Sequence, residues 1–186
     1  MLNQFSRTEL LLGKEALDKL AGSRVAVFGI GGVGGYVCEA LVRSGVGEFD
    51  LIDDDKVCLT NLNRQIIATR KTIGKYKVEV MRDRILEINP DAKVNVHKCF
   101  FLPENAEEFP FEEYDYIVDA VDTVTAKISL VMAAKEKNVP IISSMVITAR
   151  SLRSAIRENL SSDRSASPEA TQCLIFCQWL QTPVQK

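Results

Sequence analysis

A strand and a glycine-rich turn meet in the stretch Val27-Phe28-Gly29-Ile30-Gly31-Gly32-Val33-Gly34. The residues before Gly29 form a continuous apolar run, which is typical of a strand covered on both faces of a parallel sheet. The glycines let backbone N–H groups approach an anion, and a helix predicted over residues 33–44 directs its positive end to the same place. The stretch therefore predicts a phosphate cradle. The pattern alone does not distinguish one nucleotide from another, and a merely tight turn is the plainer alternative.

Acidic and cationic residues follow at places that suit a nucleotide. Asp53 ends the predicted strand at residues 49–53, where it would bind ribose hydroxyls or simply be solvated. The three carboxylates of Asp53-Asp54-Asp55 repel one another, so we expect a Mg²⁺ accompanying ATP, with Asp55 or Asp122 as ligand. Arg64 and Lys77 would balance a triphosphate, although Lys77 alone also suits an exposed helix charge.

The composition predicts one globular domain, and the length leaves room for an appendage. The chain has 186 residues, of which 46% are hydrophobic and 26% charged, and its net charge of −2 gives no global attraction to nucleic acid. Its five cysteines are an odd count without close pairing in the first part, which favours reduced thiols. With no signal-like start or membrane-length apolar run, we expect a cytoplasmic protein. The single histidine, His97, is expected at the surface and argues against catalytic triads.

Strands and helices are expected to alternate along the chain, which predicts an α/β fold of the Rossmann-like, doubly wound type. Its sheet would be mostly parallel, with helices on both faces. The strands are expected at residues 24–28, 49–53, 93–97, 116–119 and 141–144, and the main helices at 13–20, 33–44, 75–88 and 124–137. No glycine follows Gly74, and the serine-rich character of residues 146–186 predicts a divergent, partly disordered tail after a first domain at residues 1–145. Within it, residues 161–171 would be a linker and residues 173–180 form a short apolar run.

Two further clusters leave their interpretation open. Asp119 and Asp122 end a predicted strand where ligands bind in such folds, but with Lys127 they would also suit a capping arrangement. The run containing Arg70, Lys71 and Lys75 would contact RNA phosphate, bind the triphosphate, or be plainly solvated.

Five ordered motifs together resemble the ThiF–MoeB–ubiquitin-activating enzyme superfamily, which adenylates carboxylates with ATP. They are Gly29-Ile-Gly-Gly-Val-Gly34, Asp53-x-Asp55, Asn61-x-x-Arg64-Gln65, Lys77 and Asp119-x-x-Asp122. The resemblance covers residues from about 7 to 145. It implies a site in which Gly29, Gly31, Gly32, Gly34, Asp53, Asp55, Asn61, Arg64 and Lys77 bind ATP. Within it, Gly32 would lie beside the α-phosphate, Asp53 would hold the ribose, and Asp122 would meet the metal or the pyrophosphate. Arg7 would reach into the partner subunit's site, and Arg7, Arg64, Lys77 and Asp122 would serve catalysis.

Within the superfamily, the motifs resemble most closely the tRNA threonylcarbamoyladenosine dehydratases. The similar stretches are Thr60-Asn61-Leu62-Asn63-Arg64-Gln65-Ile66, residues 77–90 and Asp119-Ala-Val-Asp-Thr-Val-x-x-Lys127. Sulfur-carrier activators usually carry two Cys-x-x-Cys pairs for zinc, whereas this chain has only Cys173-x-x-x-Cys177, so we expect no structural zinc. The resemblance implies an ATP-dependent enzyme, a homodimer acting on tRNA, and possible cooperation with a cysteine desulfurase system.

The chain departs from the family pattern after Ser143-Ser144-Met145. The family continues with a Gly-Ala-Gly-like turn and a substrate-binding half, whereas this chain reads Val146-Ile-Thr-Ala-Arg. We interpret the change as a truncated, frame-altered or divergent end. The alternatives are an activator of a ubiquitin-like carrier and a nucleotide-binding remnant whose tail leaves the site incomplete. A nicotinamide dehydrogenase would leave Arg64 and Lys77 without a role.

Overall fold

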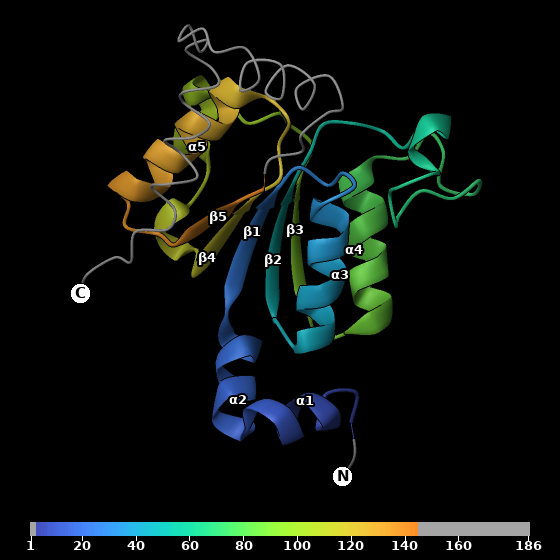
Figure 1. Cartoon of the computed structure of the whole chain (residues 1–186), viewed down its shortest axis with the longest axis vertical. Coiled ribbons are helices and arrows are strands. Elements are labelled where there is room, and N and C mark those ends of the chain that lie inside the picture. The colour runs from blue at the N-terminus through green and yellow to red at the C-terminus, as the bar shows by residue number, and fades with distance from the viewer. Residues whose placement is uncertain (1–2, 145–186) are drawn as a thin grey trace, which may run out of the picture. The chain divides into compact units, whose positions relative to one another are not determined.

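The computed structural model describes residues 3–144, in which five parallel strands form one sheet (Figure 1). The strands are β1 (Arg24–Phe28), β2 (Glu48–Ile52), β3 (Lys93–His97), β4 (Tyr116–Asp119) and β5 (Ile141–Ser143). Their order in the sheet is β3-β2-β1-β4-β5, and every neighbouring pair is parallel. The strand order reverses beside β1, which puts the glycine turn after β1 at the position where open α/β sheets bind ligands.

Helices cover both faces of the sheet, as predicted for a doubly wound fold (Figure 1). Helices α3 (Gly34–Ser44) and α4 (Lys77–Ile88) pack on one face through Val42, Met81 and Ile85. On the other face, α5 (Val124–Glu136) and the short 3₁₀ turns η2 (Pro103–Glu108) and η3 (Phe111–Glu113) enclose a second core. That core is rich in aromatic rings, which include Phe28, Phe101, Phe109 and Phe111.

The boundaries differ from the prediction at a few places. The expected strand at 49–53 is β2, Glu48–Ile52, so Asp53 lies just beyond the strand end. The helix expected from residue 75 begins at Lys77, because Lys56 and Tyr76 form an antiparallel bridge and the Lys75 carbonyl accepts a hydrogen bond from Val57. Helix α2 (Lys14–Gly22) was expected at 13–20, whereas α1 (Ser6–Leu12) was not predicted.

Gly29 and Gly34 make the tight turn possible. A Cβ atom at Gly34 would lie 1.9 Å from the Gly29 carbonyl oxygen, and one at Gly29 would lie 2.6 Å from the Ala120 carbonyl oxygen. Gly29 also has a φ of 89°, which L side chains rarely adopt. The turn therefore needs glycine at these two positions for packing, whatever it binds.

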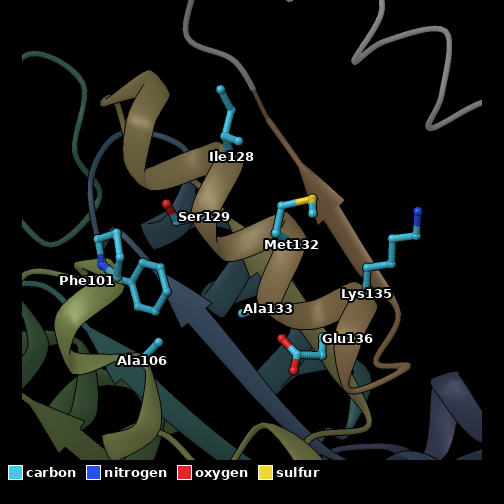
Figure 2. Close-up of a pocket in the computed structure, with 9 residues that line it drawn as sticks. Phe101, Ala106, Ile128, Ser129, Met132, Ala133, Lys135 and Glu136 are labelled. Carbon is cyan, nitrogen blue, oxygen red and sulfur yellow. The ribbon is translucent and has the colours of Figure 1, made fainter.

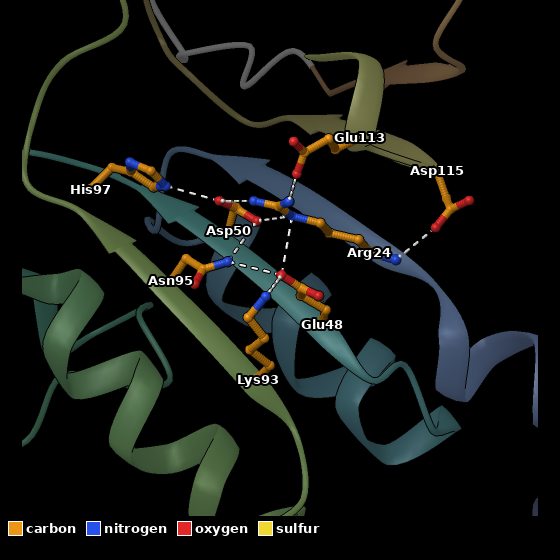
Figure 3. Close-up of polar contacts among 8 residues, drawn as sticks. All are labelled: Arg24, Glu48, Asp50, Lys93, Asn95, His97, Glu113 and Asp115. Carbon is orange, nitrogen blue, oxygen red and sulfur yellow. Dashed lines mark hydrogen bonds and ion pairs between the residues drawn. The ribbon is translucent and has the colours of Figure 1, made fainter. Parts of the chain in front are cut away.

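A polar network fills part of the second face of the sheet (Figure 3). The Asp50 carboxylate is fully buried and accepts hydrogen bonds from Arg24 Nε at 2.8 Å and Asn95 Nδ2 at 3.2 Å, and its Oδ1 lies 2.9 Å from His97 Nε2. Burial raises the pKa of Asp50, but the hydrogen bonds from His97, Arg24 and Asn95 outweigh it and hold that pKa at about 2. The expectation of a surface His97 is met only in part, because its side chain is 29% exposed and its ring lies between Asp50 and Phe109.

The expectations about membrane-spanning segments and about cysteines can be compared with the structure only for the described residues. Among residues 3–144, no helix has the length and hydrophobicity needed to cross a bilayer. The thiols of Cys38, Cys58 and Cys99 are free. The predicted tail, its linker and the Cys173–Cys177 pair lie outside the described residues.

Candidate nucleotide-binding site

The glycine turn between β1 and α3 presents unpaired backbone donors. The N–H groups of Gly31, Gly32, Val33 and Gly34 have no hydrogen-bond acceptor among residues 3–144. Helix α3 begins directly behind them, and its first turn carries no acidic side chain. Four open N–H groups at the positive end of a helix form an anion site whose geometry suits a phosphate.

Asp53 is held firmly beside this turn. Its Oδ2 accepts a hydrogen bond from Ile30 N at 2.7 Å, and its Oδ1 accepts one from Asp55 N at 2.8 Å. Only 9% of the side chain is exposed, and this burial raises the pKa of Asp53, while Lys77 and the two amides oppose the shift. Each oxygen keeps a further lone pair, so the carboxylate can still accept hydroxyl donors.

Lys77 lies in the same site rather than on an exposed helix face. It begins α4 and is 6% exposed, with its Nζ 2.6 Å from Asp55 Oδ2 and 3.6 Å from Asp53 Oδ2. The Asp55 side chain is 68% exposed, so this carboxylate can move aside. A buried ammonium that is paired with an exposed carboxylate can exchange that partner for an anionic ligand.

Arg64 approaches the turn from the residues that follow the 3₁₀ segment η1 (Leu59–Asn61), in which Asn61 lies. Asn61 is buried, and its Oδ1 accepts the backbone hydrogen bond of Cys58 at 3.0 Å. The Arg64 stem lies against Gly32, since its Cγ is 3.6 Å from where a Cβ of Gly32 would be. The Arg64 guanidinium is exposed, donates to the Thr60 carbonyl at 3.0 Å and has no carboxylate partner among residues 3–144.

The acidic pair after β4 divides into two different roles. Asp119 is fully buried, and both its oxygens lie 3.0 Å from Lys127 Nζ, which also donates to the Ser144 carbonyl. This pair ties α5 to β4 and β5, which favours the structural alternative for it. Asp122 is exposed without a partner among residues 3–144. Among the described residues, the group of three acidic side chains whose oxygens lie within 4.8 Å of one another, close enough to share a metal ion, is Asp53, Asp54 and Asp55, and Asp122 is not part of it.

Arg7 lies far from this site within its own chain. It is on α1, whose neighbour Phe5 comes within 3.7 Å of the Cβ position of Gly45, at the far end of α3 from the glycine turn. Figure 1 shows α1 and α2 at the opposite end of the sheet from the turn. Arg7 is exposed and cannot complete the site of its own chain.

A separate apolar groove of about 650 Å³ lies between α5 and η2 (Figure 2). Phe101, Ala106, Ile128 and Met132 line it together with Glu136. It shares no residue with the glycine turn or with its acidic and cationic neighbours. The groove is therefore a feature distinct from the nucleotide site.

Comparison with known proteins agrees with this geometry. The chain matches the ThiF family over residues 5–176. It belongs to the ThiF family. This confirms the superfamily resemblance that the five motifs indicated, and the Rossmann-like fold follows from it.

Relatives of this ThiF-family chain include two bacterial tRNA threonylcarbamoyladenosine dehydratases. The protein of Bacillus subtilis is 48% identical over 145 residues, covering 78% of this chain and 57% of the relative. That of Escherichia coli is 41% identical over 141 residues, covering 76% and 53%. A crystal structure of the E. coli enzyme, TcdA, in complex with ATP aligns with a TM-score of 0.74, covering 75% of this chain and 58% of that one. The chain thus spans about half the length of the curated relatives it matches.

One site residue escaped the sequence analysis. Gln65 is 6% exposed, and its Nε2 lies 4.0 Å from where a Cβ of Gly31 would be. Its place directly after Arg64 in a motif was a signal, but no periodicity or charge predicted that this amide would be buried beside the turn.

Proposed function

We propose that this ThiF-family chain is an ATP-dependent tRNA threonylcarbamoyladenosine dehydratase, or the nucleotide-binding half of one. The observation that carries the proposal is the convergence of four open N–H groups with Asp53, Arg64 and Lys77 at one edge of the sheet. A ribose acceptor, an anion cradle and two cations suit ATP. The names of the bacterial relatives support tRNA as the second substrate.

The reaction needs positioning and charge neutralisation more than a protein nucleophile. An oxygen of the threonyl carboxylate attacks the α-phosphorus of ATP, and pyrophosphate leaves. The carbamoyl oxygen of the same modified adenosine then attacks the activated carbonyl carbon, and AMP leaves as the ring closes. The net change is loss of water from the substrate. Because the second nucleophile is already in the substrate, its effective concentration is high.

Each site residue takes a role that its surroundings permit. The turn of Gly29, Gly31, Gly32 and Gly34 receives the α-phosphate on its N–H groups, and Asp53 accepts the ribose hydroxyls. Asn61, Arg64 and Lys77 bind the phosphates, with Lys77 leaving Asp55 for the nucleotide. Such preorganised donors stabilise charge that grows on the phosphates in the transition state.

Mg²⁺ fits the carboxylates at this edge of the sheet. A hard cation prefers oxygen ligands and would reduce the charge of the triphosphate. Asp55 already pairs with Lys77 at 2.6 Å, whereas Asp122 is exposed and has no partner among residues 3–144. Asp122 is therefore the freer ligand, and Asp55 is the alternative once Lys77 turns to the phosphates.

A homodimer would bring Arg7 to the site. Leu10, Leu11 and Leu12 beside it expose 87%, 85% and 55% of their surface, which is unusual for a short apolar run in a monomer. Two-fold symmetry would let each α1 cross to the neighbouring subunit. We further propose a cytoplasmic location, and a cysteine desulfurase system as a partner.

Titration calorimetry with ATP–Mg²⁺ and with NAD tests the nucleotide site, and pyrophosphate release with tRNA that carries threonylcarbamoyladenosine tests the reaction. We expect binding of ATP but not of NAD, and release of pyrophosphate that depends on the modified tRNA. Binding of NAD without ATP would contradict the adenylating site. Binding of ATP without turnover would instead favour the nucleotide-binding remnant.

An activator of a ubiquitin-like carrier is the second candidate. A relative named adenylyltransferase and sulfurtransferase MOCS3, from Culex quinquefasciatus, is 34% identical over 146 residues. This function predicts a stable complex with a small protein that ends in Gly-Gly and pyrophosphate release that depends on it. The same assay with a carrier in place of tRNA separates the two functions.

A further inference from the structure

Gln65 is a buried amide whose hydrogen bonds the chain leaves incomplete. Its Oε1 is buried without a partner, and its Nε2 makes no hydrogen bond to any other residue in the range 3–144. Folded proteins keep few buried polar atoms unpaired, because each carries a free-energy penalty. An apolar side chain of the same length would fill this space without that penalty, so the presence of an amide needs an explanation.

The position of Gln65 supplies one. Three consecutive residues lie against the glycine turn, each opposite one glycine. The distances to the places where glycine Cβ atoms would be are 3.6 Å for Arg64 Cγ at Gly32, 4.0 Å for Gln65 Nε2 at Gly31, and 3.3 Å for Ile66 Cγ2 at Gly35. The donor end of the Gln65 amide thus reaches the turn at a residue whose own N–H is open.

We propose that Gln65 is a nucleotide-positioning residue, whose Nε2 donates a hydrogen bond to the phosphate that the glycine turn receives. The inference rests on the proposed nucleotide site and adds a neutral donor to it. The Gln65 side chain is 6% exposed, whereas the Arg64 guanidinium next to it is exposed and hydrogen-bonded to the Thr60 carbonyl and the Asn63 side chain. The free-energy cost of the unpaired Oε1 is the consequence of keeping the Nε2 directed to the turn.

Replacing the amide by an apolar side chain of similar length separates binding from folding. In the 186-residue chain, Gln65→Met should leave the Tm of the ligand-free protein unchanged or raise it, since the unpaired carbonyl is removed. The Kd values for ATP and for AMP should both rise by about 10- to 100-fold, the usual range for a hydrogen bond to a charged group. The two factors should be equal, because both ligands carry the phosphate that lies on the turn. Unchanged Kd values, or a lower Tm with unchanged Kd values, would overturn the proposal.

A second variant and a matched control complete the test by calorimetry and thermal unfolding. Gln65→Glu places a carboxylate against the phosphate and should weaken AMP and ATP more than Gln65→Met does. Ile66→Val removes one methyl group from the neighbouring contact and should lower the Tm while leaving both Kd values unchanged. If Ile66→Val weakens ATP as much as Gln65→Met, packing rather than the amide is responsible and the proposal fails. If the wild-type chain binds no ATP, the proposed function itself fails, whereas wild-type binding with an unaffected Gln65→Met removes only the role of Gln65.

Discussion

Asp53 shows how a single residue is prepared for a ligand before the ligand binds. The Ile30 and Asp55 amides hold its two oxygens at 2.7 and 2.8 Å, and burial raises its pKa. Its orientation is therefore fixed by the strand end and the glycine turn. We expect Asp53→Ala to weaken ATP binding by about 1–3 kcal/mol, the size of lost hydrogen bonds to a charged group. Calorimetry measures this, and a Kd equal to that of the wild type would contradict the ribose role.

Arg64 and Lys77 are expected to contact phosphates that AMP lacks. Arg64→Ala and Lys77→Ala should therefore raise the Kd for ATP by a larger factor than the Kd for AMP. The Arg64 variant is the cleaner one, because its guanidinium is exposed, whereas Lys77 is buried and balances Asp53 and Asp55. Titrating both variants with both nucleotides tests the assignment. Equal factors for the two ligands would mean that the cations are structural.

The sequence could predict which residues converge here because the carboxyl ends of parallel strands meet at one edge of a sheet. It could not predict how they would be paired. That Lys77 is buried against Asp55, and that Gln65 is buried unpaired, depends on how the irregular segment at residues 53–76 folds back over the turn. Such a segment has no periodicity from which burial can be inferred.

At the level of elements, the buried strands were the most predictable part. β1, β3 and β4 have the predicted bounds, because continuous apolar or alternating runs between turn residues define them. Helix α1 was missed because none of its residues is buried and its three leucines are consecutive, so it has no apolar face at helical spacing. The polar network under β1, β2 and β3 was missed because its members come from three separate strands.

That network predicts a specific acid sensitivity. The pKa of Asp50 is about 2 in the fold and about 3.9 in an unfolded chain, so its stabilising contribution is complete above about pH 4 and is lost as the pH falls toward 2. The loss should be on the order of 2–3 kcal/mol in the free energy of unfolding. Asp50→Asn should be less stable at neutral pH, since Arg24 loses its buried partner, but its stability should fall less between pH 4 and 2. Denaturant unfolding of both proteins across this pH range measures how the free energy of unfolding depends on pH. The same pH dependence in the wild type and in Asp50→Asn would contradict the prediction.

We expect the turn at residues 69–75 to contact RNA phosphate. Arg70, Lys71 and Lys75 are exposed without carboxylate partners in the described range, on a turn braced by the Thr72 hydroxyl. Replacing all three by Ala should weaken tRNA binding and reduce the slope of log K against log salt by about 0.7–0.9 per lost phosphate contact. ATP affinity should not change. The control is the double variant Lys14→Ala with Lys19→Ala, on α2 at the other end of the sheet. If the control weakens tRNA binding equally, the general positive charge of the protein rather than this turn is responsible.

At the scale of the whole molecule, the main feature is an apolar surface on α1 that no other described residue covers. The leucines of α1 are largely exposed, and α1 lies at the end of the sheet away from the glycine turn (Figure 1). An exposed run of this kind beside Arg7 favours an interface with a second copy. In such a dimer each site would combine Asp53, Arg64 and Lys77 of one chain with Arg7 of the other.

A shared site can be tested by subunit complementation. Arg7→Ala and Arg64→Ala each change an exposed side chain, so both variants should fold, and each homodimer should bind ATP weakly at both sites. In a mixed dimer, one site carries both changes while the other has the intact Arg64 of one chain and the intact Arg7 of its partner. Titration of purified heterodimers should therefore show one ATP site per dimer that has the wild-type Kd. Sedimentation must first establish the dimer: a monomer, or heterodimers in which neither site recovers, would refute an arginine supplied by the neighbouring subunit.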